Sequence, residues 1–340
     1  MLILGIESSC DETAAAVLAG TDILSNVVAS QTPWHARFGG VVPEIAARKH
    51  IEMITDVVDE ALTQADTPLD SIDAIAVTTK PGLVGALVVG LAFAKGLSFA
   101  TDIPLYGVNH LEGHMVANKL AQPELEPPFV SLIVSGGNTL LVYCEQSGVY
   151  RTLGETLDDA VGEAFDKIAK VLDLGYPGGP ILSKLAREGD PSAIEFPRAM
   201  MHTKDYRFSL SGLKTAVITY IREQQKQHEM QGHGELNIPD IAASFQQAVI
   251  DVQVHKAVRA VQETGAKWFC LGGGVAANTV LREALTEAME SIDVRVSVPP
   301  LDLCGDNAAM IAGVVAVGGD AELLDNTAET QARSTFSSYY

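Results

Sequence analysis

The 340 residues exceed the size at which a single hydrophobic core keeps growing, so we expect two domains. Hydrophobic residues make up 47% of the chain, which is ample for two cores. The net charge of −20 argues against nucleic-acid binding by the bare surface, so such a role needs a local basic patch or a basic partner subunit.

Strands and helices alternate in the first half of the chain. Runs rich in β-branched and apolar residues predict strands at 2–9, 13–19, 23–30, 72–79 and 104–108. Apolar residues at helical spacing predict a helix over 43 to about 64, and Pro43 suits its first turn. The apolar run 83–100 is interrupted by glycines and by Lys95, so we expect a buried helix rather than a membrane span.

The second half restarts the same order of elements. Strands are predicted at 129–135, 140–144, 149–153, 268–271 and 294–298. Helices are predicted at 158–172, 211–225, 239–263, 278–289 and 306–317. The segment 176–180 contains Pro177 and Pro180, so we expect a loop that a helix cannot cross.

This repeated order predicts two versions of one α/β lobe with a cleft between them, where ligands often bind. We place the first lobe at 1–127 and the second at 128–320. Polar residues from about Asp320 onwards predict a flexible tail over 321–340.

The cysteines and the N-terminus bear on the cellular compartment. The spacing of Cys10, Cys144, Cys270 and Cys304 matches neither a disulfide framework nor a zinc cage. The first five residues are too short and lack a basic start for a signal peptide. We therefore expect reduced thiols in a cytoplasmic protein with no membrane partner.

His110 and His114 are the first candidate metal ligands. Residues four apart share a helix face, with Cβ atoms about 5–6 Å apart, so both imidazoles could reach one metal ion. Leu111 stands where the zinc-protease pattern H-E-x-x-H has its glutamate, which disfavours protease chemistry. The alternative is two surface or capping histidines. Asp306 is a third candidate ligand, although its place before an apolar helix also suits a helix N-cap.

Three glycine-rich turns follow predicted strands, at 79–82, 134–137 and 272–278. Glycine lets backbone N–H groups approach an anion closely, and a following helix N-terminus adds a favourable dipole. None of the three matches the phosphate-loop or dinucleotide fingerprint, and ordinary turns also use glycine. The turns are therefore candidates for phosphate or nucleotide binding.

Ten segments together resemble the tRNA N6-adenosine threonylcarbamoyltransferase family, and they run in the family's order over about residues 1–315. They are GIESSCDET (5–13), GGVVPE (39–44), PGLVGAL (81–87), HLEGH (110–114), VSGG (134–137), GEAFDK (162–167), YPGGP (176–180), FSLSGLKT (208–215), GGVAAN (273–278) and DN (306–307). The combination is far more specific than any one segment. Asn138 departs from the family's usual histidine, and the basic C-terminal segment common in bacterial relatives is missing.

The resemblance implies a fold of two ribonuclease-H-like lobes, as in actin, the sugar kinases and Hsp70. It implies transfer of a threonylcarbamoyl group from threonylcarbamoyl-AMP to N6 of the adenosine 3′ to the anticodon, in tRNAs reading codons that begin with A. It also implies that His110, His114 and Asp306 hold one divalent metal ion per subunit. Two histidines and one carboxylate with open positions suit Fe²⁺ or Zn²⁺.

The resemblance further implies a set of substrate contacts and partners. The substrate contacts are Ile133, Val134, Ser135, Gly136, Gly137, Asp166, Gly179 and Asn278. The implied partners are tRNA, a shorter paralogous subunit with the same lobe fold, and a small ATPase subunit. In the first turn, Asp11 or Glu12 is a candidate base for the N6 proton, the alternative being that both simply close the turn.

Two other classes of protein share this fold. A non-catalytic scaffold paralogue would be expected to lose the two histidines and Asp306, and all three are present. A small-molecule kinase would need a catalytic aspartate, and the sequence singles none out. For tRNA contact, the candidate basic residues form two groups: Arg37, Arg48, Lys49 and His50, and Lys204, Arg207 and Lys214.

Overall fold

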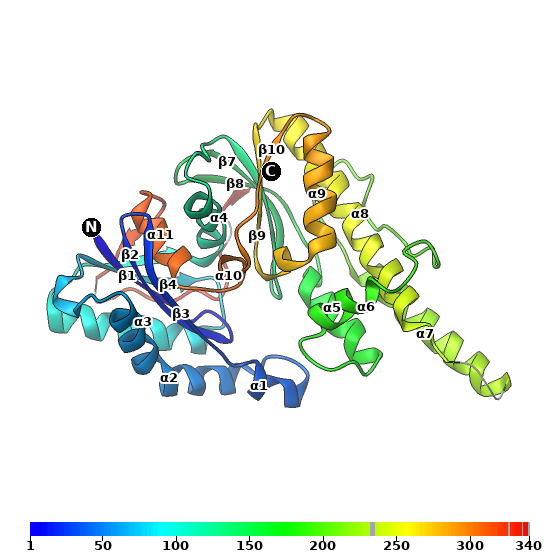
Figure 1. The fold of residues 1–340 in the computed structure, drawn as a ribbon, viewed down its shortest axis with the longest axis horizontal. Coiled ribbons are helices and arrows are strands. Elements are labelled where there is room, and N and C mark those ends of the chain that lie inside the picture. The colour runs from blue at the N-terminus through cyan, green and yellow to red at the C-terminus, as the bar shows by residue number, and fades with distance from the viewer. Residues whose placement is uncertain (232–234, 326, 335, 339–340) are drawn as a thin grey trace.

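The computed structural model describes residues 1–231, 235–325, 327–334 and 336–338. The chain forms two lobes, each built on a six-stranded mixed sheet (Figure 1). In Figure 1 the first sheet lies to the left, in blue and cyan, and the second lies to the right of it.

The first sheet has the strand order β11-β5-β4-β1-β2-β3. Its strands are β1 (Leu2–Glu7), β2 (Glu12–Ala19), β3 (Asp22–Ser30), β4 (Ala74–Lys80), β5 (Leu105–Asn109) and β11 (Glu322–Leu323). The strands β1, β2 and β3 pair antiparallel, β4 pairs parallel with β1, and β5 pairs parallel with β4. The first five match the predicted strands, with ends that differ by two residues at most.

The second sheet repeats this arrangement in the order β10-β9-β6-β7-β8-β12. Its strands are β6 (Phe129–Val134), β7 (Thr139–Gln146), β8 (Val149–Glu155), β9 (Trp268–Gly272), β10 (Arg295–Ser297) and β12 (Ser337–Ser338). Again three antiparallel strands come first, and two parallel strands follow on the far side of the first of them. The predicted duplication of one lobe is confirmed.

Two long helices cover the outer face of the first sheet, α2 (Pro43–Gln64) and α3 (Val84–Thr101). Short helical segments precede them and separate them, α1 (Thr32–His35), η1 (Ala36–Phe38) and η2 (Leu69–Ser71). By length and composition alone α3 could cross a membrane, which is a weak indication, and 28% of its residues are buried. The expectation of a buried helix therefore holds for one stripe only, because Val84, Val88 and Phe99 are exposed.

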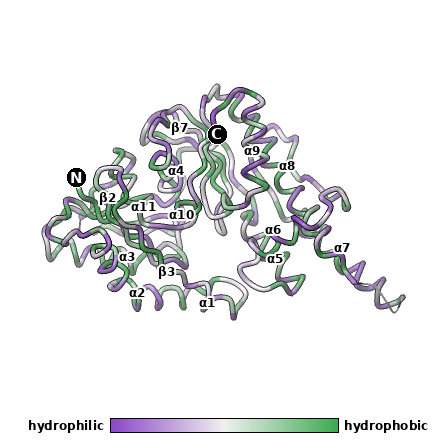
Figure 2. Tube along the Cα trace, viewed as in Figure 1, coloured by the Kyte–Doolittle hydropathy of each residue, from purple (hydrophilic) through white to green (hydrophobic). Residues whose placement is uncertain are grey.

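Apart from one helix at the junction of the lobes, the remaining helices belong to the second half of the chain. They are α5 (Val161–Val171), α6 (Gly178–Ala186), α7 (Ser211–Gln231), α8 (Ile238–Thr264), η3 (Gly274–Ala277), α9 (Thr279–Glu290), α10 (Leu301–Cys304) and α11 (Ala309–Ala316). Figure 2 shows hydrophobic residues along the strands of both sheets and hydrophilic residues along the outer end of α7. The expectation of a loop over 176–180 is wrong in part, since α6 begins at Gly178. Pro180 lies in the first turn of α6, where its missing N–H costs no helical hydrogen bond.

The helix α4 (His110–Ala121) lies between the two sheets (Figure 1), and its residues 110–118 are all buried. On one side α4 packs against α11, and on the other side against β9. Two glycines allow the close approaches. A Cβ on Gly272 would lie 2.9 Å from the carbonyl oxygen of His114, and a Cβ on Gly5 would lie 2.3 Å from that of Ala308. The first contact sets α4 against β9, and the second sets the start of α11 against β1.

The placement of α11 corrects the predicted lobe boundary at residue 320. Its residues Met310 and Ile311 share a core with Ile3, Ala14 and Ala76 of the first sheet. In Figure 1 this orange helix lies beside β1 and β2 rather than with the second sheet. The chain thus returns to the first lobe after α10, because the apolar residues of α11 complete that lobe's inner face.

The prediction of a flexible tail over 321–340 is also wrong for the residues that the structure describes, which pair with both sheets. The strand β11 pairs with β5, and β12 pairs with β8. Between them the N–H of Gln331 donates to the carbonyl of Thr79 at 2.9 Å. Phe336 is buried, with its ring centroid 4.9 Å from that of Tyr150. Backbone pairing at sheet edges, which polar side chains do not prevent, accounts for the difference; residues 326, 335, 339 and 340 lie outside the described part of the tail.

Candidate metal centre and active site

His110, His114 and Asp306 come together at the junction of the two lobes. The side chain of Asn109 caps α4 by accepting the N–H of Leu111 at 3.0 Å, so His110 is the first helical residue. Asp306 lies in the link between α10 and α11. One ligand atom from each of the three residues lies within 4.8 Å of the others, in a group that could hold a metal ion.

The spacing of the donor atoms suits one small cation. The Nε2 atoms of His110 and His114 lie 3.4 Å and 3.3 Å from Oδ1 of Asp306. Ligand atoms bonded at about 2.0–2.1 Å to a tetrahedral ion lie roughly 3.3–3.4 Å apart. The two imidazole rings meet edge-on, at 4.7 Å between centroids and 81° between planes. Both rings therefore direct a nitrogen towards the same carboxylate oxygen.

The hydrogen bonds around Asp306 and His114 fit a metal site better than a helix cap formed by Asp306. Asn307, not Asp306, caps α11, since its Oδ1 accepts the N–H of Met310 at 3.0 Å. Both ring nitrogens of His114 are buried without a hydrogen-bond partner among the described residues. Buried polar atoms are nearly always partnered, so an ion at Nε2 would supply the partner that the protein does not. The residues present thus fit a divalent cation.

The pKa values of His110, His114 and Asp306 depend on one another and on burial. Burial alone would lower the pKa of His110, but the carboxylates of Asp306 and Glu7 outweigh it and raise the pKa well above its ordinary value. For His114 burial prevails and lowers the pKa, which keeps the imidazole in the neutral, metal-binding form. Burial would raise the pKa of Asp306, but His110 and His114 hold it far below its usual range. Asp306 is therefore a carboxylate at neutral pH.

Glu12 begins β2 close to this group. Its Oε1 accepts the hydroxyl of Ser30 at 3.3 Å. Burial, together with the carboxylates of Asp306 and Asp11, raises the pKa of Glu12 to about 9. A proton acceptor must be ionised, and a nearby cation favours the ionised form. The main-chain oxygen of Asp11 accepts the N–H of Gln31 at 2.9 Å, which extends the pairing of β2 with β3 by one residue.

The turn at 134–137 presents backbone rather than side chains. Ile133 and Val134 are fully buried in β6, so only their main-chain atoms could face a ligand. The hydroxyl of Ser135 accepts the N–H groups of Gly137 at 3.3 Å and of Asn138 at 3.0 Å. Gly136 and Gly137 are exposed, and a Cβ on either would meet no atom within 4 Å. The space above the turn is therefore open.

Asp166 holds the start of α6. Its Oδ1 accepts the N–H groups of Gly178 at 2.7 Å and Gly179 at 3.3 Å. Burial, opposed by these two N–H groups, raises the pKa of Asp166. The turn at Ser135 is tied to the same region, because its carbonyl accepts the N–H of Gly162 just inside α5 at 3.1 Å.

Asn278 caps α9, since its Oδ1 accepts the N–H of Leu281 at 3.1 Å. Its amide nitrogen donates to Gln246 of α8 at 2.8 Å and to Ser183 of α6 at 3.0 Å. The sequence did not single out Gln246 or Ser183, which lie on helix faces without a motif. In the sequence, the available signal was a glutamine within the largely apolar run 241–250 of α8.

Known proteins resemble this chain over most of its length. The family model described as tRNA N6-adenosine threonylcarbamoyltransferase matches residues 22–313. A protein of that name from Clostridium botulinum (strain 657 / Type Ba4) is 54% identical over 310 residues, which cover 91% of this chain and 90% of that protein. The chain belongs to the tRNA N6-adenosine threonylcarbamoyltransferase family. A relative of the same name from Clostridioides difficile (strain 630) is 52% identical over 312 residues, covering 92% of this chain and 91% of the relative.

The resemblance carried by the ten segments is thus confirmed, and members of the threonylcarbamoyltransferase family are enzymes. Solved structures with lower sequence identity support the fold alone. HypF from T. kodakarensis matches with a TM-score of 0.61 at 16% identity, over 93% of this chain and 47% of that one. An activator of the 2-hydroxyisocaproyl-CoA dehydratase from Clostridium difficile matches with a TM-score of 0.55 at 15% identity, over 94% and 95%. They support the predicted fold of two ribonuclease-H-like lobes.

Most of the basic residues considered for tRNA contact in this chain already have acidic partners. Lys214 pairs with Asp159, and Arg207 pairs with Asp205 at 2.6 Å. In the first lobe, Arg48 pairs with Glu44 at 2.7 Å and Lys49 with Glu52 at 2.6 Å. His50 does not belong to a surface group, because it is buried and bonded to Thr13 at 2.8 Å.

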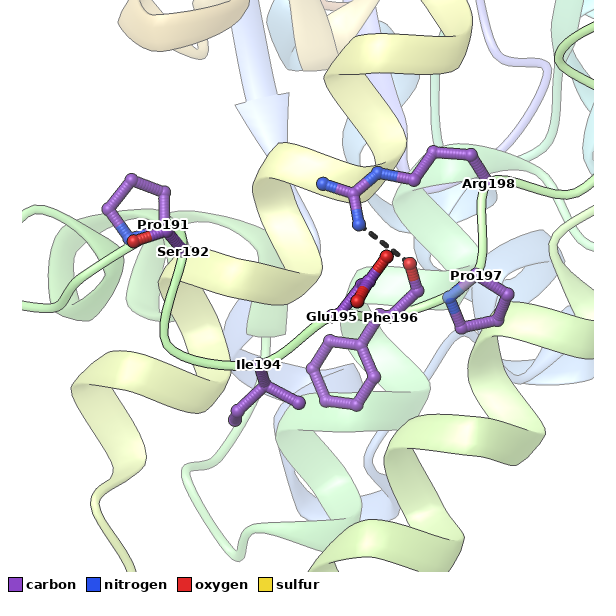
Figure 3. A pocket seen from close by; sticks show the side chains of 7 residues that line it. All are labelled: Pro191, Ser192, Ile194, Glu195, Phe196, Pro197 and Arg198. Atoms are coloured by element: carbon purple, nitrogen blue, oxygen red, sulfur yellow. Dashed lines mark hydrogen bonds between the residues drawn. The ribbon is translucent and has the colours of Figure 1, made fainter.

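An open pocket of about 600 Å³ lies apart from these residues, in the segment 191–198. Figure 3 shows Arg198 turned towards the carbonyl oxygen of Phe196, to which it donates at 2.6 Å. The same guanidinium pairs with Asp251 at 2.9 Å. Arg198, the basic residue among those that line the pocket, is therefore already paired with Phe196 and Asp251, so it is not free to bind an anion there.

Proposed function

We propose that this family member transfers the threonylcarbamoyl group from threonylcarbamoyl-AMP to N6 of the adenosine 3′ to the anticodon, in tRNAs that read codons beginning with A. We further propose that His110, His114 and Asp306 hold one divalent metal ion, Fe²⁺ or Zn²⁺. The supporting observation is the buried group of two imidazoles and one carboxylate with donor atoms 3.3 Å and 3.4 Å apart, in a chain of this family.

The reaction sets two demands on the protein. The exocyclic amine of adenine is a weak nucleophile, so it must be placed against an acyl group that is already activated by AMP. Negative charge that develops on the acyl oxygen or on the phosphate must be stabilised. A bound metal ion would supply Lewis acidity and a template for these oxygens.

The glycine turn at Ser135, Gly136 and Gly137 is our candidate for holding the adenylate through backbone N–H groups. Asp166, Gly179 and Asn278 complete this candidate substrate site, to which Ile133 and Val134 contribute only main chain. The hydrogen bonds that link α5, α6, α8 and α9 around these residues support a rigid substrate site.

Glu12 is our candidate base for the N6 proton, and Asp11 is the weaker one. Burial and then the carboxylate of Asp306 raise the pKa of Glu12, and this proximity to a proposed metal ligand supports the role. A cation at the three ligands would favour the ionised form of Glu12, which is the form that accepts a proton.

We propose three macromolecular partners, tRNA, a shorter paralogous subunit and a small ATPase, in the cytoplasm. Four exposed apolar side chains on α2 and α3, those of Ile51, Val84, Val88 and Phe99, support a protein partner on the first lobe. Because Arg48, Lys49, Arg207 and Lys214 are paired with carboxylates, we expect partners to contribute most of the contacts to tRNA phosphates.

The decisive test is transfer from pre-made threonylcarbamoyl-AMP to unmodified tRNA, with the partner subunits present and the nucleoside product identified by mass spectrometry. We expect product from the wild type and a severe loss in His114→Ala. Absence of product from the wild type would refute the activity. Full activity of His114→Ala without bound metal would refute the proposed role of the three ligands.

A further inference from the structure

Glu7 is a carboxylate placed deep inside the protein, at the end of β1. Its side chain is 0% exposed, and within the described chain its ion pair is with His110 rather than with a lysine or arginine. Oε2 accepts the hydroxyl of Thr78 at 2.5 Å and lies 3.0 Å from Nδ1 of His110. Oε1 accepts the N–H of Ser9. Two donors and one imidazole nitrogen thus surround a group that the proposed reaction does not use.

These contacts divide the two nitrogens of His110 between two carboxylates. Nδ1 faces Glu7, whereas Nε2 faces Asp306 at 3.4 Å. An ionised carboxylate can only accept hydrogen bonds, so a hydrogen bond between Oε2 of Glu7 and Nδ1 of His110 places the proton on Nδ1. In the neutral, metal-binding form of His110 the lone pair is then on Nε2, which faces Asp306 and the proposed metal position.

We propose that Glu7 is the positioning residue of the metal centre: it accepts the Nδ1–H of His110, which fixes the tautomer and the ring angle and leaves Nε2 for the metal ion. Metal-bound imidazoles commonly donate their other N–H to a carboxylate in this way. This inference rests on the proposed metal centre, but not on the transfer reaction.

Charge balance supports the same assignment. Glu7 and Asp306 bring two carboxylates to His110, from opposite sides of its ring, and both would attract a divalent cation held there. Buried charges are tolerated when they are paired and hydrogen-bonded.

The isosteric change Glu7→Gln tests the proposal with little change in volume. The amide has one acceptor oxygen, so its NH₂ group must face either the N–H of Ser9 or the Nδ1 side of His110. One buried donor then loses its acceptor, or His110 changes to the tautomer that blocks Nε2. We expect the Zn²⁺ affinity, measured by competition with a chromophoric chelator, to fall about 10–100-fold.

Two matched variants separate this effect from a general one. Glu112→Gln changes another 0% exposed carboxylate near the same histidines, but one that bonds to Tyr150 and to the N–H of Asp320. Ser9→Ala removes a hydroxyl that lies 3.2 Å from Nδ1 of His110. This hydroxyl is the other polar group, besides Glu7, that could bond to Nδ1. We expect both variants to bind Zn²⁺ like the wild type. We also expect the visible absorption of bound Co²⁺ to change in Glu7→Gln alone.

A wild-type measurement makes the test independent of whether any variant folds. In zinc-loaded protein with ¹⁵N-labelled histidine, we expect His110 to carry its proton on Nδ1. A proton on Nε2, or wild-type Zn²⁺ affinity in Glu7→Gln, or an equal loss in Glu112→Gln, would overturn the role of Glu7. Failure of the wild type to bind metal would overturn the metal centre itself, which distinguishes the two claims.

Discussion

Replacement of Gly272 by alanine probes the contact that places α4 against β9. The added Cβ would lie 2.9 Å from the carbonyl oxygen of His114 and 3.3 Å from its Cβ, whereas ordinary contacts begin near 3.4 Å. Because the nearer atom belongs to the backbone, α4 must move by about 0.5 Å, and overpacking of this kind typically costs about 1–3 kcal/mol. Metal–ligand distances tolerate only about 0.2 Å.

We therefore expect Gly272→Ala to unfold at lower denaturant concentration and to bind Zn²⁺ about tenfold more weakly, the equivalent of about 1.4 kcal/mol. Gly274→Ala is the matched control, because a Cβ there meets no atom within 4 Å. The control also corrects for the chain entropy that any glycine-to-alanine change removes from the unfolded state. If both variants unfold alike and bind Zn²⁺ alike, the argument that this close approach positions His114 is refuted.

Three further predictions concern the base, the C-terminal segment and tRNA. In Glu12→Gln, transfer from pre-made threonylcarbamoyl-AMP is expected to fall about 10²–10⁴-fold, and near-normal transfer would remove Glu12 as the base. Phe336→Ala is expected to destabilise the protein by about 3 kcal/mol, since the ring is buried against Tyr150; an unchanged urea midpoint would contradict this packing. Affinity of the assembled complex for tRNA is expected to fall steeply, on the order of 10³-fold between 50 and 200 mM salt, and a flat response would contradict a phosphate-dominated interface.

Local patterns in the sequence were sufficient for most of the individual elements. Alternating and continuous apolar runs predicted ten strands of the two sheets, and the spacing of apolar residues from Pro43 predicted α2 with both of its ends. Such patterns report which face of an element is apolar, but not which sheet that face meets. The helix α11, apolar on every side, was therefore assigned to the wrong lobe.

The parts that were missed depend on contacts between distant segments. The edge strand β11 is built from backbone hydrogen bonds, so its polar side chains gave no sign of it. For Asp306, the sequence leaves a helix cap and a metal ligand open; the structure gives the capping hydrogen bond to Asn307, and the ligand role stays a prediction. Glu7 was overlooked, although a charged residue at the end of an apolar strand was the available signal.

The most direct measurement is metal analysis of the purified protein combined with an anomalous diffraction map at the metal edge. We expect one divalent ion per chain, within bonding distance of Nε2 of both His110 and His114 and of a carboxylate oxygen of Asp306. We also expect Asp306→Asn to lose that ion while remaining folded. An active wild-type protein without metal, or an ion bound elsewhere with these three residues unligated, would contradict the proposed centre.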